Sequence, residues 1–401
     1  MTVDDCRPSN DADDCRDSPT GETLRPRGTA PDSIRRAIDA CDSFPGTCGF
    51  AGDVDGLLVR DVLGRVPLFV DDEPADGERT WAFDPTSLTE PIAFPAGCVA
   101  PIDADGHVDV ADAERVWELS SPDPATESRA DVALDPTLDR LGSTIERVTT
   151  DVSGTDLAVA FSGGVDSALL AAMLDAPLYV VGFPDGRDVE AAREAVEAMG
   201  RTADLRVEEL TLEQVERAVP VVATAIGRTN PMDVSIALSL YLVAERAAAD
   251  GYDRLVLGQG ADELFGGYEK VQRLDHRIDA ETVPGAIREL LEGLPAQLER
   301  DVLAVEAAGV RPVMPYLHDD VIELARTLPE TALVREDTRK YALRRIAREY
   351  VPTDIADREK TAIQYGSQVA RELDRLARQA GYKRRMDDHV GQYVRSRMEA
   401  R

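Results

Sequence analysis

The segment Leu157–Ser167, which reads Leu-Ala-Val-Ala-Phe-Ser-Gly-Gly-Val-Asp-Ser, constrains the fold more than any other. Leu157 to Phe161 is apolar on both faces, which predicts a strand in the middle of a parallel sheet. Gly163 and Gly164 allow a sharp turn and the close approach of a ligand. A helix from about Val165 to Leu174 is expected to follow this turn.

A strand, a glycine turn and a helix N-terminus together favour phosphate binding. The first helical N–H groups have no partner within the helix, and the positive end of the helix dipole attracts anions. Ser162 and Ser167 add hydroxyl groups on either side of the turn. The segment lacks the Gly-Lys-Ser/Thr ending of the common P-loop and the spacing of dinucleotide-binding loops. The sequence therefore predicts a phosphate site of another kind.

Composition limits the class of protein. A chain of 401 residues that is 43% hydrophobic is long enough for two globular domains. It contains no run of eighteen apolar residues, so we expect no membrane span. Its first residues are polar and acidic, so we expect no signal peptide and a cytoplasmic location.

The charge balance is unusual. The net charge is −31, and only four of the 45 basic residues are lysines. This balance resembles that of proteins adapted to high salt, and it argues against nucleic acid as a partner. In such a chain a retained lysine is a stronger functional candidate than usual, which directs attention to Lys340 and Lys360.

The six residues from Ser162 to Ser167 resemble the signature of pyrophosphate-loop ATPases, which cleave ATP between the α- and β-phosphates and leave AMP on the substrate. The resemblance implies that Ser162, Gly163, Gly164 and Ser167 contact pyrophosphate. It also implies that Asp166 helps to bind Mg²⁺, because a hard cation that bridges phosphates prefers carboxylate oxygen.

Strands and helices alternate around this signature, which predicts an α/β fold with a doubly wound parallel sheet. Ligands of such sheets bind at the carboxyl ends of the strands. The expected strands are 177–183, 205–210 and 254–258, and the expected helices are 136–148, 188–199, 212–226 and 233–250.

A second signature, Gly258–Tyr268, resembles the Gly-Glu-Gly-Ser-Asp-Glu-x-Phe-Gly-Gly-Tyr loop of asparagine synthetases, with eight of ten specified positions matching. The resemblance implies that Gly258 and Gly260 leave room for substrate and that Asp262 is a second Mg²⁺ ligand. Gln259 stands where the family has Glu. A glutamine cannot accept a proton from an amine nucleophile, although it can still hydrogen-bond an adenylate or amide.

The C-terminal part is predicted to be helical and resembles the same family. Arg339–Arg344 resembles its Lys-x-x-Leu-Arg helix, and Arg358–Gly366 resembles its Arg-x-Lys-x-x-Phe loop. The resemblance gives Lys340 and Lys360 catalytic roles, with Lys360 stabilising charge on the reacting phosphate. It also implies that backbone groups of Val181 and Gly182 contact adenine.

The N-terminal part predicts a different organisation. We expect a disordered acidic segment over residues 1–31, a small β-rich domain over 32–125 and the synthetase-like domain over 130–401. Asp32 is predicted to cap a helix from Ser33 to about Asp42, and Trp117 is predicted to begin the exit linker. Arg60–Phe69 resembles a segment of class II glutamine amidotransferase domains.

That amidotransferase-like domain is short. In the family the nucleophile is a cysteine at the mature N-terminus. Cys48-Gly-Phe-Ala-Gly resembles that start, but it is internal and lies only twelve residues before Arg60. A reduced, structural remnant is therefore expected, with a working glutaminase as the alternative. The four histidines have no partners at metal-ligand spacing and are interpreted as ordinary polar residues.

The resemblance implies an ATP-dependent ligase that uses Mg²⁺, forms an acyl-adenylate and transfers ammonia or another amine, with aspartate as the default carboxylate. A ligase of the same family acting on another carboxylate is the first alternative, favoured by Gln259 and the short N-terminal domain. A non-catalytic nucleotide-binding scaffold is the second alternative. A tRNA-modifying enzyme fits less well because the charge is wrong for RNA. A homodimer is one oligomeric state that we consider.

Overall fold

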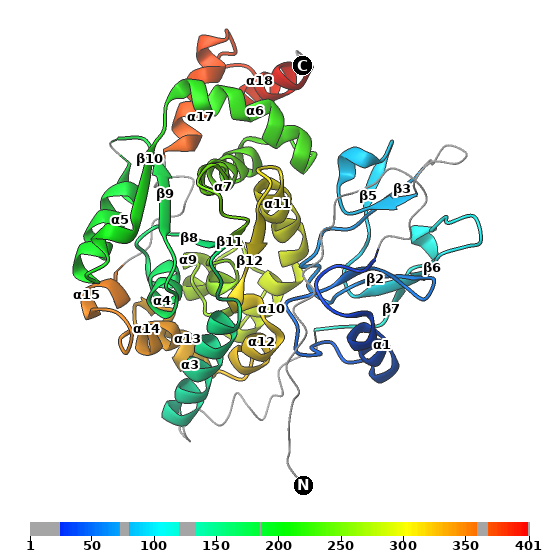
Figure 1. Ribbon diagram of the computed structural model, residues 1–401, viewed down its shortest axis with the longest axis horizontal. Coiled ribbons are helices and arrows are strands. Elements are labelled where there is room, and N and C mark those ends of the chain that lie inside the picture. Colours follow the sequence, from blue (N-terminus) through cyan, green and yellow to red (C-terminus); the bar gives the residue numbers. More distant parts are fainter. Residues whose placement is uncertain (1–24, 73–79, 120–133, 185, 359–367, 400–401) are drawn as a thin grey trace.

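A computed structural model of the chain describes residues 25–72, 80–119, 134–184, 186–358 and 368–399. Figure 1 shows two parts lying side by side: a smaller β-rich part, blue to cyan, and a larger part built around a central sheet, green to red. We call residues 25–119 the N-terminal unit and residues 134–399 the α/β unit. Among the described residues, no helix combines the length and apolar composition needed to cross a membrane.

The α/β unit is organised around a five-stranded sheet with the order β10-β9-β8-β11-β12. Every neighbouring pair in this sheet is parallel, which confirms the predicted doubly wound α/β class. The strands are β8 (Leu157–Ala160), β9 (Leu178–Gly182), β10 (Leu205–Glu209), β11 (Arg254–Val256) and β12 (Arg311–Val313). β9 is buried along its whole length, as expected for a strand covered on both faces.

Two layers of helices cover this sheet. The chain moves outward from β8 to β10 through α4 (Val165–Met173) and α5 (Arg187–Ala198), then returns to β11 through α6 (Leu212–Ile226) and α7 (Pro231–Ala249). Because crossovers are right-handed, this reversal places α4 and α5 on one face and α6 and α7 on the other (Figure 1). The reversal makes β8 and β11 the switch point, where ligands of such sheets bind.

The remaining helices surround this framework and confirm the predicted helical C-terminal part. They are α3 (Leu134–Asp151), α8 (Ala261–Leu264), α9 (Glu269–Arg273), α10 (Val283–Glu292), α11 (Leu294–Glu306), α12 (Asp319–Ala325), α13 (Glu330–Leu333), α14 (Tyr341–Ala347), α15 (Thr353–Ala356), α17 (Val369–Gln379) and α18 (His389–Glu399). The arginine-rich end of the chain forms α18, which packs on α6 and α17 (Figure 1). Short elements β13 (Val334–Arg335), β14 (Thr338–Arg339) and the 3₁₀ turn η4 (Pro315–Leu317) complete the unit.

The N-terminal unit contains two small antiparallel sheets. One has the order β1-β2-β6-β7 and the other the order β4-β3-β5. Their strands are β1 (Ala51–Val54), β2 (Leu57–Arg60), β3 (Phe69–Asp71), β4 (Trp81–Ala82), β5 (Pro91–Ala93), β6 (Cys98–Pro101) and β7 (Glu114–Arg115), and helix α1 (Pro31–Ala40) packs beside β1. Two further 3₁₀ turns are Pro85–Ser87 and Val110–Asp112 in this unit, and a third, Thr202–Asp204, precedes β10.

Three expectations for this unit were wrong. Ala30, not Asp32, is the N-cap residue of α1, because Pro31 occupies the first helical position, and Asp32 lies in the first turn. Trp117 does not belong to a linker: it is buried, stacks edge-on against Phe50 and donates its indole N–H to Ala37 O. Ordered structure also begins before residue 31, since Arg27 pairs with Ala51. Residues 1–24 and 120–133 lie outside the described residues.

Arg65 joins the two units. Its side chain is fully buried and donates to Asp61 Oδ1 at 2.8 Å, Leu317 O at 2.8 Å and Asp319 Oδ1 at 2.6 Å. Burial alone would lower the pKa of this guanidinium, but the two carboxylates outweigh burial and raise it. Asp319 also accepts the backbone N–H of Thr47 at 2.7 Å. The N-terminal unit is therefore held against the segment that begins α12.

We expect Arg65→Met to lower the free energy of unfolding by roughly 3–5 kcal/mol, because it leaves the Asp61 and Asp319 carboxylates buried without their cation. Arg147→Met is the matched control, since Arg147 pairs with Asp320 on the same helix but is half exposed, and it should cost under about 1 kcal/mol. Denaturant unfolding measures both. Equal effects of the two substitutions would show that the buried contact has no special weight.

Candidate functional site

The predicted phosphate turn is formed by the backbone itself. Gly163 has φ +74°, and a Cβ at this position would lie 2.4 Å from Ala191 O, so only glycine fits. Ser162 donates its backbone N–H to Ser167 Oγ at 3.2 Å, and Ser167 Oγ donates to Gly164 O at 3.2 Å. Gly164 is the N-cap of α4 and supplies no side-chain cap. The turn is thus closed while the start of α4 is left uncapped by side chains.

Lys340 lies at the centre of the site. Its ammonium donates to both carboxylate oxygens of Asp166 at 2.7 Å and pairs with Asp262 Oδ1 at 2.6 Å. Lys340 is 2% exposed and Asp166 is 5% exposed, so these charges interact away from solvent. The structure therefore brings together three residues that were predicted separately, from α4, α8 and the segment before α14.

The backbone around Lys340 explains how the lysine reaches this position. Lys340 follows the β13–β14 hairpin and has φ +57°, a left-handed conformation that is uncommon for a residue with a side chain. A Cβ on Gly267 would lie 1.9 Å from Asp262 Oδ1 and 2.3 Å from Lys340 Cε. A side chain at position 267 would therefore block the contact between Lys340 and Asp262, and glycine leaves this space free.

Tyr316 is hydrogen-bonded to the backbone of Asp166, a contact that the sequence did not predict. Its buried hydroxyl donates to the backbone oxygen of Asp166 at 2.8 Å, and burial raises the pKa of this phenol. Tyr316 comes from η4, which follows β12. The Met-Pro-Tyr-Leu run was visible in the sequence, but nothing in it indicates that the hydroxyl reaches α4.

Gly258 lets the second signature approach the first, and Gly260 lets it approach the turn η4. A Cβ on Gly258 would lie 3.3 Å from Asp166 Cβ, and a Cβ on Gly260, which has φ +91°, would lie 2.5 Å from Leu317 Cδ2. Between them, the partly exposed Gln259 donates its amide N–H to Asp301 Oδ2 at 3.4 Å. Asp301 comes from α11, and no local pattern in the sequence connects it with this loop.

Asp166 and Asp262 have the chemistry of a magnesium site that is completed by phosphate oxygens, since Mg²⁺ is commonly held by one or two carboxylates. Their oxygens converge on one point, as the two contacts to Lys340 Nζ demonstrate. Within the described residues, no group of three or more His, Cys, Asp or Glu side chains could hold a metal by itself. In this structure the Lys340 ammonium lies where the two carboxylates meet, so a metal ion held by them would share them with the lysine.

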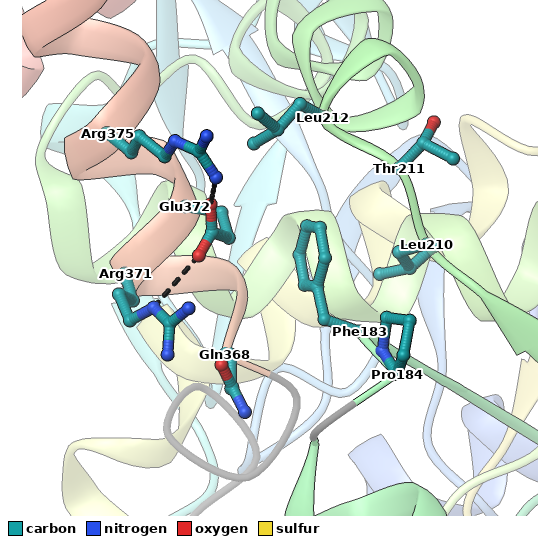
Figure 2. A pocket seen from close by; sticks show the side chains of 9 residues that line it. All are labelled: Phe183, Pro184, Leu210, Thr211, Leu212, Gln368, Arg371, Glu372 and Arg375. Atoms are coloured by element: carbon teal, nitrogen blue, oxygen red, sulfur yellow. Dashed lines mark hydrogen bonds and ion pairs between the residues drawn. The ribbon is translucent and has the colours of Figure 1, made fainter.

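A cavity of about 280 Å³ lies at the carboxyl ends of β9 and β10. Figure 2 shows Phe183 and Pro184 on one side, and Arg371, Glu372 and Arg375 from α17 on the other. Glu372 accepts from Arg371 at 2.9 Å and from Arg375 at 3.3 Å. The cavity begins one residue after Gly182, so it adjoins the predicted adenine contacts.

Two further predictions concern the adenine contacts at Val181 and Gly182 and the catalytic lysine Lys360. Val181 and Gly182 are buried in β9, and Gly182 O already accepts the N–H of Leu210 at 2.9 Å. Lys360 lies outside the described residues. Arg358, two positions earlier, donates to Ala191 O at 2.7 Å, which is the atom that a side chain on Gly163 would strike.

Two of the four histidines, His318 and His389, lie at the start of helices. His318 accepts the N–H of Asp320 and caps α12, and burial lowers the pKa of its imidazole. His389 contacts Asp374 at 2.8 Å at the start of α18.

The family model for asparagine synthase matches residues 139–304 and 285–397, which together cover nearly all of the α/β unit. The chain belongs to the asparagine synthase family. This confirms the resemblance drawn from the two signatures and places the chain in a family of ATP-dependent ligases. The match does not extend to the N-terminal unit, whose likeness to glutamine amidotransferases stays a prediction.

Individual members of the asparagine synthase family are distant. A putative glutamine-hydrolysing asparagine synthetase of Methanocaldococcus jannaschii is 26% identical over 391 residues, covering 83% of this chain and 70% of that protein. The glutamine-hydrolysing asparagine synthetase of Triphysaria versicolor is 24% identical, covering 64% of this chain and 47% of its own. Asparagine synthetase B of Escherichia coli is 25% identical, with coverages of 52% and 41%. The chain thus spans less than half the length of the latter two proteins.

We expect Lys340→Met to remove ligase activity and to lower the free energy of unfolding by roughly 3–5 kcal/mol, because two carboxylates then lie close together without the ammonium. Lys270→Met is the control: Lys270 lies over the ring of Tyr268 but contacts neither Asp166 nor Asp262 in the described structure. Thermal unfolding and ATP turnover measure the two effects. A Lys340→Met protein as stable as wild type would contradict the central role of this ion pair.

Proposed function

We propose that this protein forms an amide bond by activating a carboxylate with ATP. The proposed reaction is asparagine synthesis from aspartate and ammonia. The observation that carries the proposal is the convergence of Asp166, Lys340 and Asp262 beside the phosphate turn. Charged groups prearranged around a reacting phosphate stabilise charge that develops there.

In the proposed reaction, an oxygen of the substrate carboxylate attacks the α-phosphorus of ATP, and pyrophosphate leaves. The nitrogen lone pair of ammonia then attacks the acyl carbon of the adenylate. The acyl–oxygen bond breaks, AMP departs with its electron pair, and the nitrogen loses a proton to a base or to water. The protein contributes mainly position and charge.

The nucleotide is proposed to lie across the carboxyl ends of β8 and β9. The turn at Ser162, Gly163, Gly164 and Ser167 would hold pyrophosphate together with the first N–H groups of α4. Val181 and Gly182 would meet adenine, with the cavity of Figure 2 extending the space beside them. The order of strands supports this arrangement, because β9 is the direct neighbour of β8.

Magnesium bound with the nucleotide would supply positive charge that lowers the cost of the developing negative charge. Asp166 and Asp262 would hold it. Lys340 keeps these carboxylates in place and oriented toward the phosphate turn. Lys360 is proposed as the second cation at the reacting phosphate, and the anchoring of Arg358 on Ala191 next to Gly163 supports this role.

The nitrogen is proposed to come as free ammonia or another amine, with the N-terminal unit acting as a structural partner. Cys48 is exposed, but it follows Thr47, whose N–H is bound to Asp319, and α1 lies upstream in the same unit. Exposing an amine at Cys48 would require removal of α1 and loss of this contact. The division into an N-terminal unit and a synthetase-like domain agrees with this proposal.

A second candidate is amide ligation with a different carboxylate. Gln259 favours it, because its amide contacts Asp301 and cannot act as a proton acceptor. The two candidates share the adenylation chemistry and differ in the acceptor substrate.

We expect pyrophosphate release from Mg-ATP with aspartate and ammonium in high salt, and none with glutamine in place of ammonium. Lys340→Met is the negative control, and EDTA should abolish release while MgCl₂ restores it. Release with glutamine alone would revive the glutaminase alternative. No pyrophosphate release with aspartate, from a protein that still binds ATP, would contradict asparagine synthesis and favour another carboxylate.

A further inference from the structure

Asp301 on α11 is a buried carboxylate whose two oxygens face different partners. Arg300 donates its Nε–H to Oδ1 at 2.8 Å, and Gln259 donates its Nε2–H to Oδ2 at 3.4 Å. Asp301 is only 5% exposed, whereas Gln259 is partly exposed. The carboxylate therefore lies behind the glutamine, on the interior side of the loop that follows β11.

This contact decides which way the Gln259 amide points. A side-chain amide has one donor end and one acceptor end, and an ionised carboxylate accepts hydrogen bonds only. With Nε2 committed to Asp301, Oε1 is the amide atom that remains to accept a hydrogen bond from another partner. The opposite orientation would set a carbonyl oxygen against a carboxylate and lose the hydrogen bond.

Asp301 is itself held firmly. Arg300 also donates to Asp233 Oδ1 at 2.8 Å, and Asp233 Oδ2 accepts from Arg228 at 3.3 Å. Arg228 donates in turn to Glu299 at 3.0 Å. This ionic chain restrains Asp301 from turning toward solvent, and Arg60, 3.7 Å from Glu299, adds a third cation to its three carboxylates.

We propose that Asp301 is a positioning residue of the ligase site: it fixes the Gln259 amide so that Oε1 accepts a hydrogen bond from the N–H of the incoming amine. The inference rests on the proposed function, because it assigns the orienting of the nitrogen substrate to a pair of residues at the carboxyl end of β11. A neutral acceptor orients the lone pair of ammonia without binding the ammonium ion tightly.

Asp301→Asn tests the proposal with Asp233→Asn as a matched control. Both substitutions remove one of the two carboxylates that pair with Arg300, but only Asp301 contacts Gln259. Asparagine can also donate, so the Gln259 amide becomes free to turn over. We expect Asp301→Asn to raise the KM for ammonium about tenfold, the effect of one hydrogen bond. The KM for ATP should stay within about twofold in both variants.

A thermal double-mutant cycle tests the contact without any need for catalysis. Gln259→Glu places two carboxylates in contact and should lower Tm by roughly 3 °C. Adding Asp301→Asn should restore Tm, because the pair is then again one carboxylate and one amide. Additive Tm changes, or equal KM changes in Asp301→Asn and Asp233→Asn, would overturn the proposal. A coupled cycle in an otherwise inactive wild-type protein would count against the ligase function while upholding the Asp301–Gln259 contact.

Discussion

The Lys340 ammonium between Asp166 and Asp262 is the interaction on which the site depends. The two carboxylates belong to separate glycine-rich segments, and without a cation between them they would repel each other in a buried setting. The lysine draws α4, α8 and the segment before α14 to one point. Gly258 and Gly267 make this approach possible, since side chains there would meet Asp166 or Lys340 itself.

The same contact explains why position 340 is a lysine in a chain whose basic residues are mostly arginine. Arginine serves well at the exposed pairs of the surface and at Arg65, where a planar group reaches several acceptors. At position 340 the space beside Gly267 admits a slender chain and a compact ammonium. The rarity of lysine in the sequence was thus a useful signal, because geometry and not charge alone decides which cation fits.

The sequence predicted what depends on local pattern and motif. Buried strands and amphipathic helices of the α/β unit were placed to within a few residues, and Asp166 and Asp262 were expected to lie together, although the position of Lys340 between them was not. It failed where tertiary contacts decide. Trp117 looked like part of a polar exit segment, and Tyr316 and Asp301 carried no local sign of their partners. Such contacts join residues more than forty positions apart, beyond the range of periodicity.

The buried contacts of Arg65 also limit how the sequences of the two units can change. The Arg65 guanidinium is buried between Asp61 and Asp319, so loss of either carboxylate would leave a buried charge without one of its partners. Arg60, likewise buried, adds a contact to Glu299 at 3.7 Å. Because these ion pairs join the two units, a substitution at Arg60 or Arg65 in the N-terminal unit also affects the packing of the α/β unit. Either unit on its own would leave buried charges without their partners.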